Sequence, residues 1–152
     1  MYASRVRLMS AGVALPWLVA LVAVATLAAL VAAAPATASR NATKRERAAI
    51  TRAVQTSAVG GIQQVPRSHY RVTGQKVSTV SRYWATANMV ARPKFVGTFQ
   101  NAEVVAVRPA GTSRWVVVDV GTAQVGCGIA PDSVLADLFN VKTPCPPGTG
   151  IP

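Results

Sequence analysis

Acidic residues are scarce in this sequence of 152 residues, which contains five Asp and Glu but sixteen Lys and Arg. Histidine occurs once, at His69, and cysteine only at Cys127 and Cys145. These three side chains do not fill the four-ligand set of a structural zinc site. A Ser–His–acid triad could use only His69, and the sequence has neither a Gly-x-Ser-x-Gly elbow nor a glycine-rich phosphate loop. We therefore expect no metal, no cofactor and no catalytic residue of a recognised type.

The few acids also form no evident catalytic pair. Hydrolysis by paired carboxylates needs two acids that converge at a defined separation. Asp132 and Asp137 lie five positions apart, which directs them to different sides of a short helix. Asp132 is better explained as an acidic residue that interacts favourably with the positive N-terminal end of the helix dipole. The leading prediction is a non-enzymatic protein. The alternative is a small extracytoplasmic enzyme of unrecognised type, with a deep pocket lined by His69, an acid and a tyrosine.

Residues 1–38 have the pattern of a secretory signal. Arg5 and Arg7 precede an uncharged stretch from residue 11 to residue 34, and Pro35-Ala36-Thr37-Ala38 follows it. A charged start, an apolar middle and an Ala-x-Ala end predict export with cleavage between Ala38 and Ser39. The 18 residues from 17 to 34 are also long enough to cross a bilayer. An uncleaved anchor, as in a membrane-anchored accessory protein, is therefore an alternative. The basic residues beyond Ser39 leave retention in the cytoplasm as a third.

The predicted exported part contains both cysteines, Cys127 and Cys145, and most of the charge. An even number of cysteines in an oxidising compartment predicts a disulfide. Residues 39–152 keep fourteen basic and five acidic residues, a net charge of +9. Eleven of these basic residues lie between Ser39 and Lys94, against Glu46 alone. Such a field attracts polyanions, whereas its simpler interpretation is a solvated surface that keeps the domain soluble.

Helical signals come first in the exported part. Thr43 and Glu46 have the spacing of a capping box, and Ile50, Ala53 and Val54 recur on one helical face. Gly60-Gly61 supplies a stop, so we predict a helix from about Lys44 to Val59. A second, short helix is expected after Pro131, ending near Asn140.

Strand patterns fill the middle of the chain. Alternation begins at His69 and changes parity at Gly74, which predicts a bulge. Further strands are predicted for residues 84–90, 103–108 and 115–120, with a hairpin turn between the last two. In the final strand, Val116, Val118 and Val120 are expected on one face and Val117 and Asp119 on the other.

This order predicts an α+β fold. We expect an N-terminal helix packed on a mainly antiparallel, curved sheet of three to five strands, and a short C-terminal helix tied by the disulfide. The domains are residues 1–38 as signal or anchor, 39–143 as one α+β domain and 144–152 as an irregular tail. The layout is similar to the cystatin-like and NTF2-like group.

A second resemblance rests on short stretches between Thr43 and Cys145. They are Ile50-Thr51-Arg52-Ala53-Val54, Val77-Ser78-Thr79-Val80, Trp84-Ala85, Arg114-Trp115-Val116-Val117-Val118-Asp119-Val120-Gly121, Val125-Gly126-Cys127-Gly128, Pro131, Val134, Asp137-Leu138 and Cys145. With these the chain resembles small exported proteins of actinobacteria, a group that has no known activity. The resemblance implies export and a disulfide but no reaction.

The predicted function is binding through a basic surface. Its contact residues would be Arg45, Arg52, Arg67, Arg71 and Arg82, and its partner an anionic envelope polymer, lipid head groups or another protein. Rings beside cations, as in Arg82-Tyr83-Trp84 and Arg114-Trp115, could also stack on bases. Strand aromatics more often face the core, however, and export argues against nucleic acid as the natural partner.

Overall fold

The computed structural model describes residues 38–151. Residues 1–37, with most of the predicted signal or anchor segment, lie outside the described part of the chain. The described elements, in chain order, are β1 (Arg40–Asn41), α2 (Lys44–Thr56), the 3-10 helix η1 (Val59–Gln64), β2 (Tyr70–Val77), β3 (Trp84–Ala91), the 3-10 helix η2 (Pro93–Phe95), β4 (Ala102–Val107), β5 (Val116–Gly121) and α3 (Asp132–Phe139). Between residues 38 and 151, no helix is both long enough and apolar enough to cross a bilayer.

One five-stranded sheet has the order β1-β2-β3-β4-β5, and each strand runs antiparallel to its neighbours. The α+β class and the antiparallel sheet are therefore confirmed. β1 was not predicted, because its two residues are too few to show a period. Its pairing with Lys76 and Val77 places the start of the domain at the sheet edge.

Helix α2 begins as the sequence predicts. The Thr43 side chain accepts a hydrogen bond from the Glu46 amide, and the Glu46 carboxylate accepts one from the Thr43 amide. The helix ends at Thr56, three residues earlier than expected, before Gly60 and Gly61 are reached. The Ser57 hydroxyl accepts a hydrogen bond from the Val59 amide. This local bond competes with the next helical turn and turns the chain into η1.

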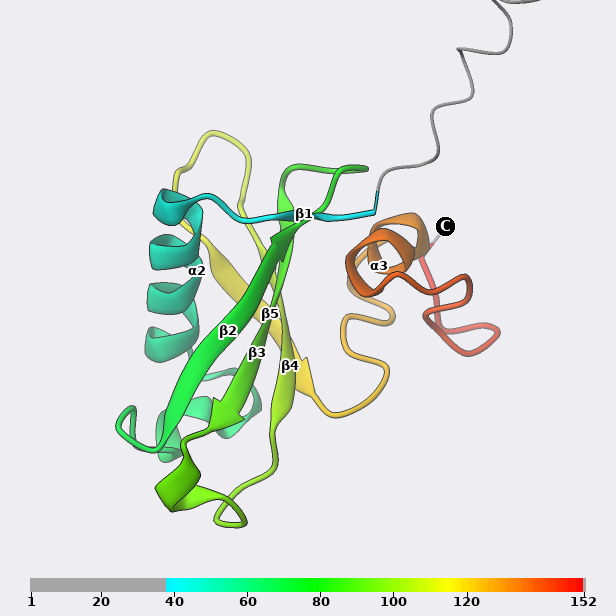
Figure 1. Cartoon of the computed structure of the whole chain (residues 1–152). Helices are drawn as coiled ribbons and strands as arrows, with labels where there is room; N and C mark the ends of the chain where they lie inside the picture. The colour runs from blue at the N-terminus through cyan, green and yellow to red at the C-terminus, as the bar shows by residue number, and fades with distance from the viewer. Residues whose placement is uncertain (1–37, 152) are drawn as a thin grey trace, which may run out of the picture. The chain divides into compact units, whose positions relative to one another are not determined.

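The sheet is covered on both faces. Ile50 and Val54 of α2 are fully buried against one face, in a cluster with Tyr70, Val104 and other strand residues. On the other face, Val105 packs with Leu135 of α3, Val125 and Cys145. Figure 1 shows α2 and α3 on opposite sides of the strands. A helix packed on one face of the sheet was expected, and the C-terminal segment forms a partial third layer that covers Val105 on the other face.

Two bulges set which side chains face α2. The predicted bulge in β2 is confirmed, since the register shifts between Thr73 and Lys76 and Gly74 has a φ of 62°. A second bulge in β5 was missed: Val105 pairs with Asp119 and Ala106 with Val117, which leaves Val118 as the extra residue. The predicted faces of β5 are therefore wrong. Val117 and Val120 both pack on the α2 side, and Val118 packs on the other.

The predicted disulfide is confirmed. Cys127 and Cys145 are bonded with their Cα atoms 5.6 Å apart, and α3 lies between them. Asn140 ends α3 in a left-handed conformation with a φ of 55°. Beyond Cys145 the chain returns to the start of α3, where the Asp132 amide donates to the Ile151 carbonyl at 2.9 Å. The tail thus contacts the helix that precedes it.

Candidate anion-binding surface

The five predicted arginines do not form one patch. All five are exposed. Arg45 and Arg52 lie on α2, Arg67 follows η1, Arg71 is on β2 and Arg82 is in the turn between β2 and β3. A site can therefore be defined only from the elements that surround each arginine.

Arg45 and Arg52 lie along one groove. A cavity of about 390 Å³ is lined by Thr43, Arg45, Glu46, Ala49, Arg108, Thr112, Ser113 and Trp115. A second cavity, of about 170 Å³, is lined by Ala49, Arg52, Ala53, Thr56, Ser113, Arg114 and Trp115. The two share Ala49, Ser113 and Trp115 and form one groove between α2 and the loop that joins β4 to β5, which we call the hairpin groove. Because seven residues separate them, the two helical arginines are about 10 Å apart along the helix axis.

The opposite wall supplies two cations that the sequence prediction did not include. The Arg108 guanidinium lies 5.2 Å from the centre of the Trp115 ring and 5.7 Å from that of Tyr83. Such stacking holds a guanidinium in place while its edge can still donate hydrogen bonds. Arg114 lines the smaller cavity. The adjacent Arg114-Trp115 pair was a usable signal, but nothing local in the sequence places Arg108 beside Trp115.

Arg82 joins this group through Tyr83. Its guanidinium lies 5.5 Å from the centre of the Tyr83 ring, the same ring that Arg108 contacts. Interaction of the Tyr83 phenol with the Arg82 side chain, together with the charges of Arg82 and Arg108, lowers the pKa of the phenol. The positive charge therefore continues from the groove onto the turn between β2 and β3.

Glu46 is the one acid that lines the hairpin groove, and its charge is already paired. Its carboxylate accepts hydrogen bonds from both terminal nitrogens of Arg40, at 2.7 and 2.8 Å. The bond from Arg40, together with those from Thr43, lowers the pKa of Glu46 to about 2, against the opposing effect of burial. Arg45, Arg52, Arg108 and Arg114 are consequently left as an excess of positive charge along the groove.

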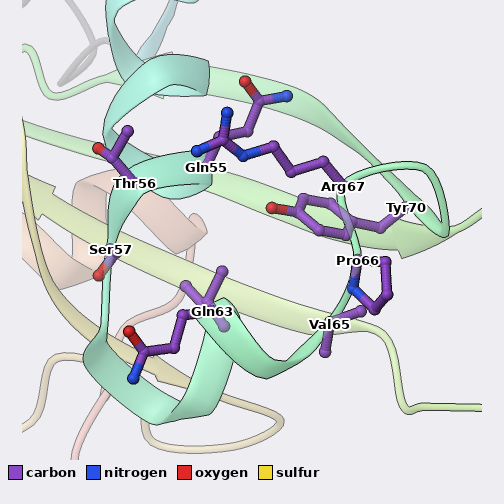
Figure 2. A pocket seen from close by; sticks show the side chains of 9 residues that line it. Gln55, Thr56, Ser57, Gln63, Val65, Pro66, Arg67 and Tyr70 are labelled. Atoms are coloured by element: carbon purple, nitrogen blue, oxygen red, sulfur yellow. The ribbon is translucent and has the colours of Figure 1, made fainter.

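Arg71 and Arg67 lie elsewhere. Tyr70 packs in the core on the α2 side, so the next side chain, Arg71, points to the other face of the sheet. Arg67 lines a separate cavity of about 400 Å³ with Gln55, Thr56, Ser57, Ile62, Gln63, Val65, Pro66 and Tyr70 (Figure 2). His69 does not line it. Its ring stacks on Phe95 with the centroids 3.8 Å apart.

Among the described residues, the acids gather into no group that could hold a metal ion. Within residues 38–151, no three His, Cys, Asp or Glu side chains lie close enough to hold a metal ion. The Asp137 carboxylate accepts hydrogen bonds from the amide and hydroxyl of Thr79, at 2.8 and 3.0 Å. Asp132, in the first turn of α3, has a buried Oδ1 with no hydrogen-bond partner in the described chain.

We compared the chain with known protein families, with curated proteins and with solved structures, and found no match.

Proposed function

We propose that residues 39–152 are an exported, non-enzymatic domain that binds an anionic polymer of the cell envelope or the extracellular space. The hairpin groove and the adjoining Arg82 form the contact surface. Arg67 and Arg71 contribute only to the overall positive field.

The observation that carries this proposal is the arrangement of four arginines on two walls. Arg45 and Arg52 come from α2, whereas Arg108 and Arg114 come from the loop between β4 and β5. The hydroxyls of Thr43 and Ser113 line the same groove and can donate hydrogen bonds to oxyanions. A groove between one helix and one hairpin suits a single extended chain that follows its length.

The disulfide supports the exported location. Disulfides persist in oxidising compartments and are rare in reducing cytoplasm. The bond between Cys127 and Cys145 therefore agrees with the secretory pattern of residues 1–38. N-terminal sequencing of the protein recovered from culture medium tests this part of the proposal, and we expect it to begin at Ser39. A chain that begins at Met1 in a membrane fraction would contradict cleavage.

Binding is tested with immobilised dextran sulfate and, in parallel, with uncharged dextran. We expect retention on the sulfated matrix alone, and we expect it to fall steeply as salt rises from about 50 to 500 mM, because salt screens exposed charges. Retention that does not depend on salt would contradict charge-based binding. Vesicles of anionic lipid serve as a second matrix, and a clear preference for them over the polymer would redirect the proposal to lipid head groups.

A matched pair of double variants separates the groove from the overall charge. Arg45→Gln with Arg114→Gln removes one arginine from each wall. Arg67→Gln with Arg71→Gln removes the same charge outside the groove. Exposed ion contacts of this kind contribute about 0.2–1 kcal/mol each, so we expect the first variant to bind about fivefold to tenfold more weakly and the second to change little. An equal loss in both would contradict a groove site.

A further inference from the structure

The cavity in Figure 2 lies where α2 ends, beside η1 and the start of β2. Its volume of about 400 Å³ falls in the range of about 300–1,000 Å³ that is usual for small-molecule sites. Part of its wall is apolar, made by Ile62, Val65 and Pro66. The rest is polar, and no acid contributes to it among the described residues. The cavity shares one lining residue, Thr56, with the smaller cavity of the hairpin groove, but none of the arginines of that groove line it.

Tyr70 is the unusual member of this wall. The residue is only 2% exposed, and its ring packs edge-on against Phe99 with the centroids 6.4 Å apart. A buried tyrosine usually finds a hydrogen-bond partner for its hydroxyl. The Tyr70 hydroxyl has none in the described chain, and Figure 2 shows it directed away from β2, toward the end of α2. The partner that is missing from the protein can therefore be supplied from the cavity.

The groups around this hydroxyl are donors. Burial raises the pKa of the Tyr70 phenol, while the Arg67 charge acts in the opposite direction. The phenol accordingly keeps its proton near neutral pH. Arg67 brings a guanidinium, and Gln55 an amide, to the same side of the cavity (Figure 2). The one ion pair among the described residues joins Arg40 to Glu46, so the Arg67 guanidinium is free to meet a charge from outside.

We propose that this cavity binds a small organic oxyanion, a carboxylate or a phosphate ester. Its charged end accepts hydrogen bonds from Tyr70, Arg67 and Gln55, and its apolar body lies on Ile62, Val65 and Pro66. Planar donors of arginine match the two oxygens of a carboxylate and those of a phosphate equally well. This site does not depend on the polymer-binding function proposed above, because it uses none of the four arginines of the hairpin groove.

The test uses the protein with four probes: benzoate, phenyl phosphate, benzyl alcohol and inorganic phosphate. Amide signals are followed by NMR during each titration. We expect benzoate or phenyl phosphate to shift the signals of Ser57, Ile62 and Tyr70. Benzyl alcohol, which has the ring without the charge, should bind at least about tenfold more weakly, since hydrogen bonds to charged groups are the stronger ones. The stronger of the two organic anions identifies the natural headgroup. Binding of inorganic phosphate as tight as that of phenyl phosphate would overturn the apolar part of the proposal.

Tyr70→Phe separates a binding role from a structural one. It keeps the ring and removes only the hydroxyl that has no partner in the protein. We expect an unchanged or slightly higher melting temperature, together with about tenfold weaker binding of the preferred anion. A clear fall in melting temperature with unchanged binding would overturn the proposal. So would an absence of shifts with all four probes.

Charge-matched controls complete the experiment. Arg67→Gln should weaken anion binding, whereas Arg71→Gln, on the other face of the sheet, should not. Arg45→Gln with Arg114→Gln should also leave benzoate binding unchanged. If the groove variants lose dextran sulfate but keep benzoate, both proposals stand. If they keep dextran sulfate and Arg67→Gln loses benzoate, only the polymer proposal fails.

Discussion

The two helices of the domain are held in place by different means. Helix α2 has thirteen residues, a capping box and two fully buried side chains, Ile50 and Val54. Helix α3 has three buried side chains, Val134, Leu135 and Leu138, but only eight residues and no side-chain cap. Helices this short are not stable on their own, and α3 depends on the disulfide, on the contact between Asp137 and Thr79 and on the returning tail. Local sequence is thus sufficient to begin one helix, whereas the other needs partners that are distant in the chain.

Of the substitutions that test this difference between the helices, removal of the disulfide should cause the largest loss of stability. Cys127→Ala with Cys145→Ala opens a loop of 18 residues, which costs about 3 kcal/mol in the loop-entropy treatment. Denaturant unfolding measures the loss. Hydrogen exchange in native buffer should show that α3 loses protection first while α2 keeps most of it. Equal loss of protection in both helices would show that the disulfide does not stabilise α3 in particular.

Asp137→Ala should have the next largest effect. Burial alone would raise the pKa of Asp137, but hydrogen bonds from Ser78, Thr79 and the Val80 amide outweigh it and the pKa is lowered. Losing hydrogen bonds to a charged group costs about 1.5–3 kcal/mol, which thermal unfolding can measure. Asp132→Ala in the same helix is the control. We expect a smaller loss there, since its buried Oδ1 has no described partner.

Thr43→Ala tests the local signal of α2. It removes the side-chain bond to the Glu46 amide, and we expect a loss of about 1 kcal/mol, as is usual for an N-cap. Thr122→Ala, an exposed threonine outside any helix, should change the free energy of unfolding by less than half of that. If both substitutions had the same effect, the cap would not be what stabilises the start of α2.

Glu46→Gln should have the smallest effect near neutral pH, about 0.5–1 kcal/mol, because Arg40 is partly exposed and surface ion pairs contribute little. The clearer signal is the pH dependence. The pKa of Glu46 falls from an ordinary 4.5 to about 2 in the folded protein. The stability that the carboxylate contributes is therefore present above pH 4.5 and is lost as the pH falls toward about 2. The variant should lose less stability across that window, measured by denaturant unfolding at several pH values. Parallel curves would contradict this assignment.

The sequence predictions are accurate where a feature depends on residues close in the chain, and they fail where it depends on residues that are distant in the chain. The capping box and the bulge at Gly74 depend on residues close in sequence, and both are confirmed. The bulge at Val118 was missed because a run of valines satisfies either face, so only pairing with β4 decides which residue is extra. The same limit applies to the candidate site. Arg45 and Arg52 were expected, while Arg108 reaches the groove only through its position against Trp115.

By itself, the sequence determined the class of the fold, the cross-link and the excess of positive charge. Periodicity, an even cysteine count and composition are properties of the chain that do not require its path in space. The tertiary structure decided which charges meet, because strand register and the packing of α2 bring together arginines that are up to 69 positions apart in the chain. It also decided that Tyr70 is buried while its hydroxyl has no hydrogen-bond partner among the described residues, since burial is a property of the surrounding elements and not of the residue.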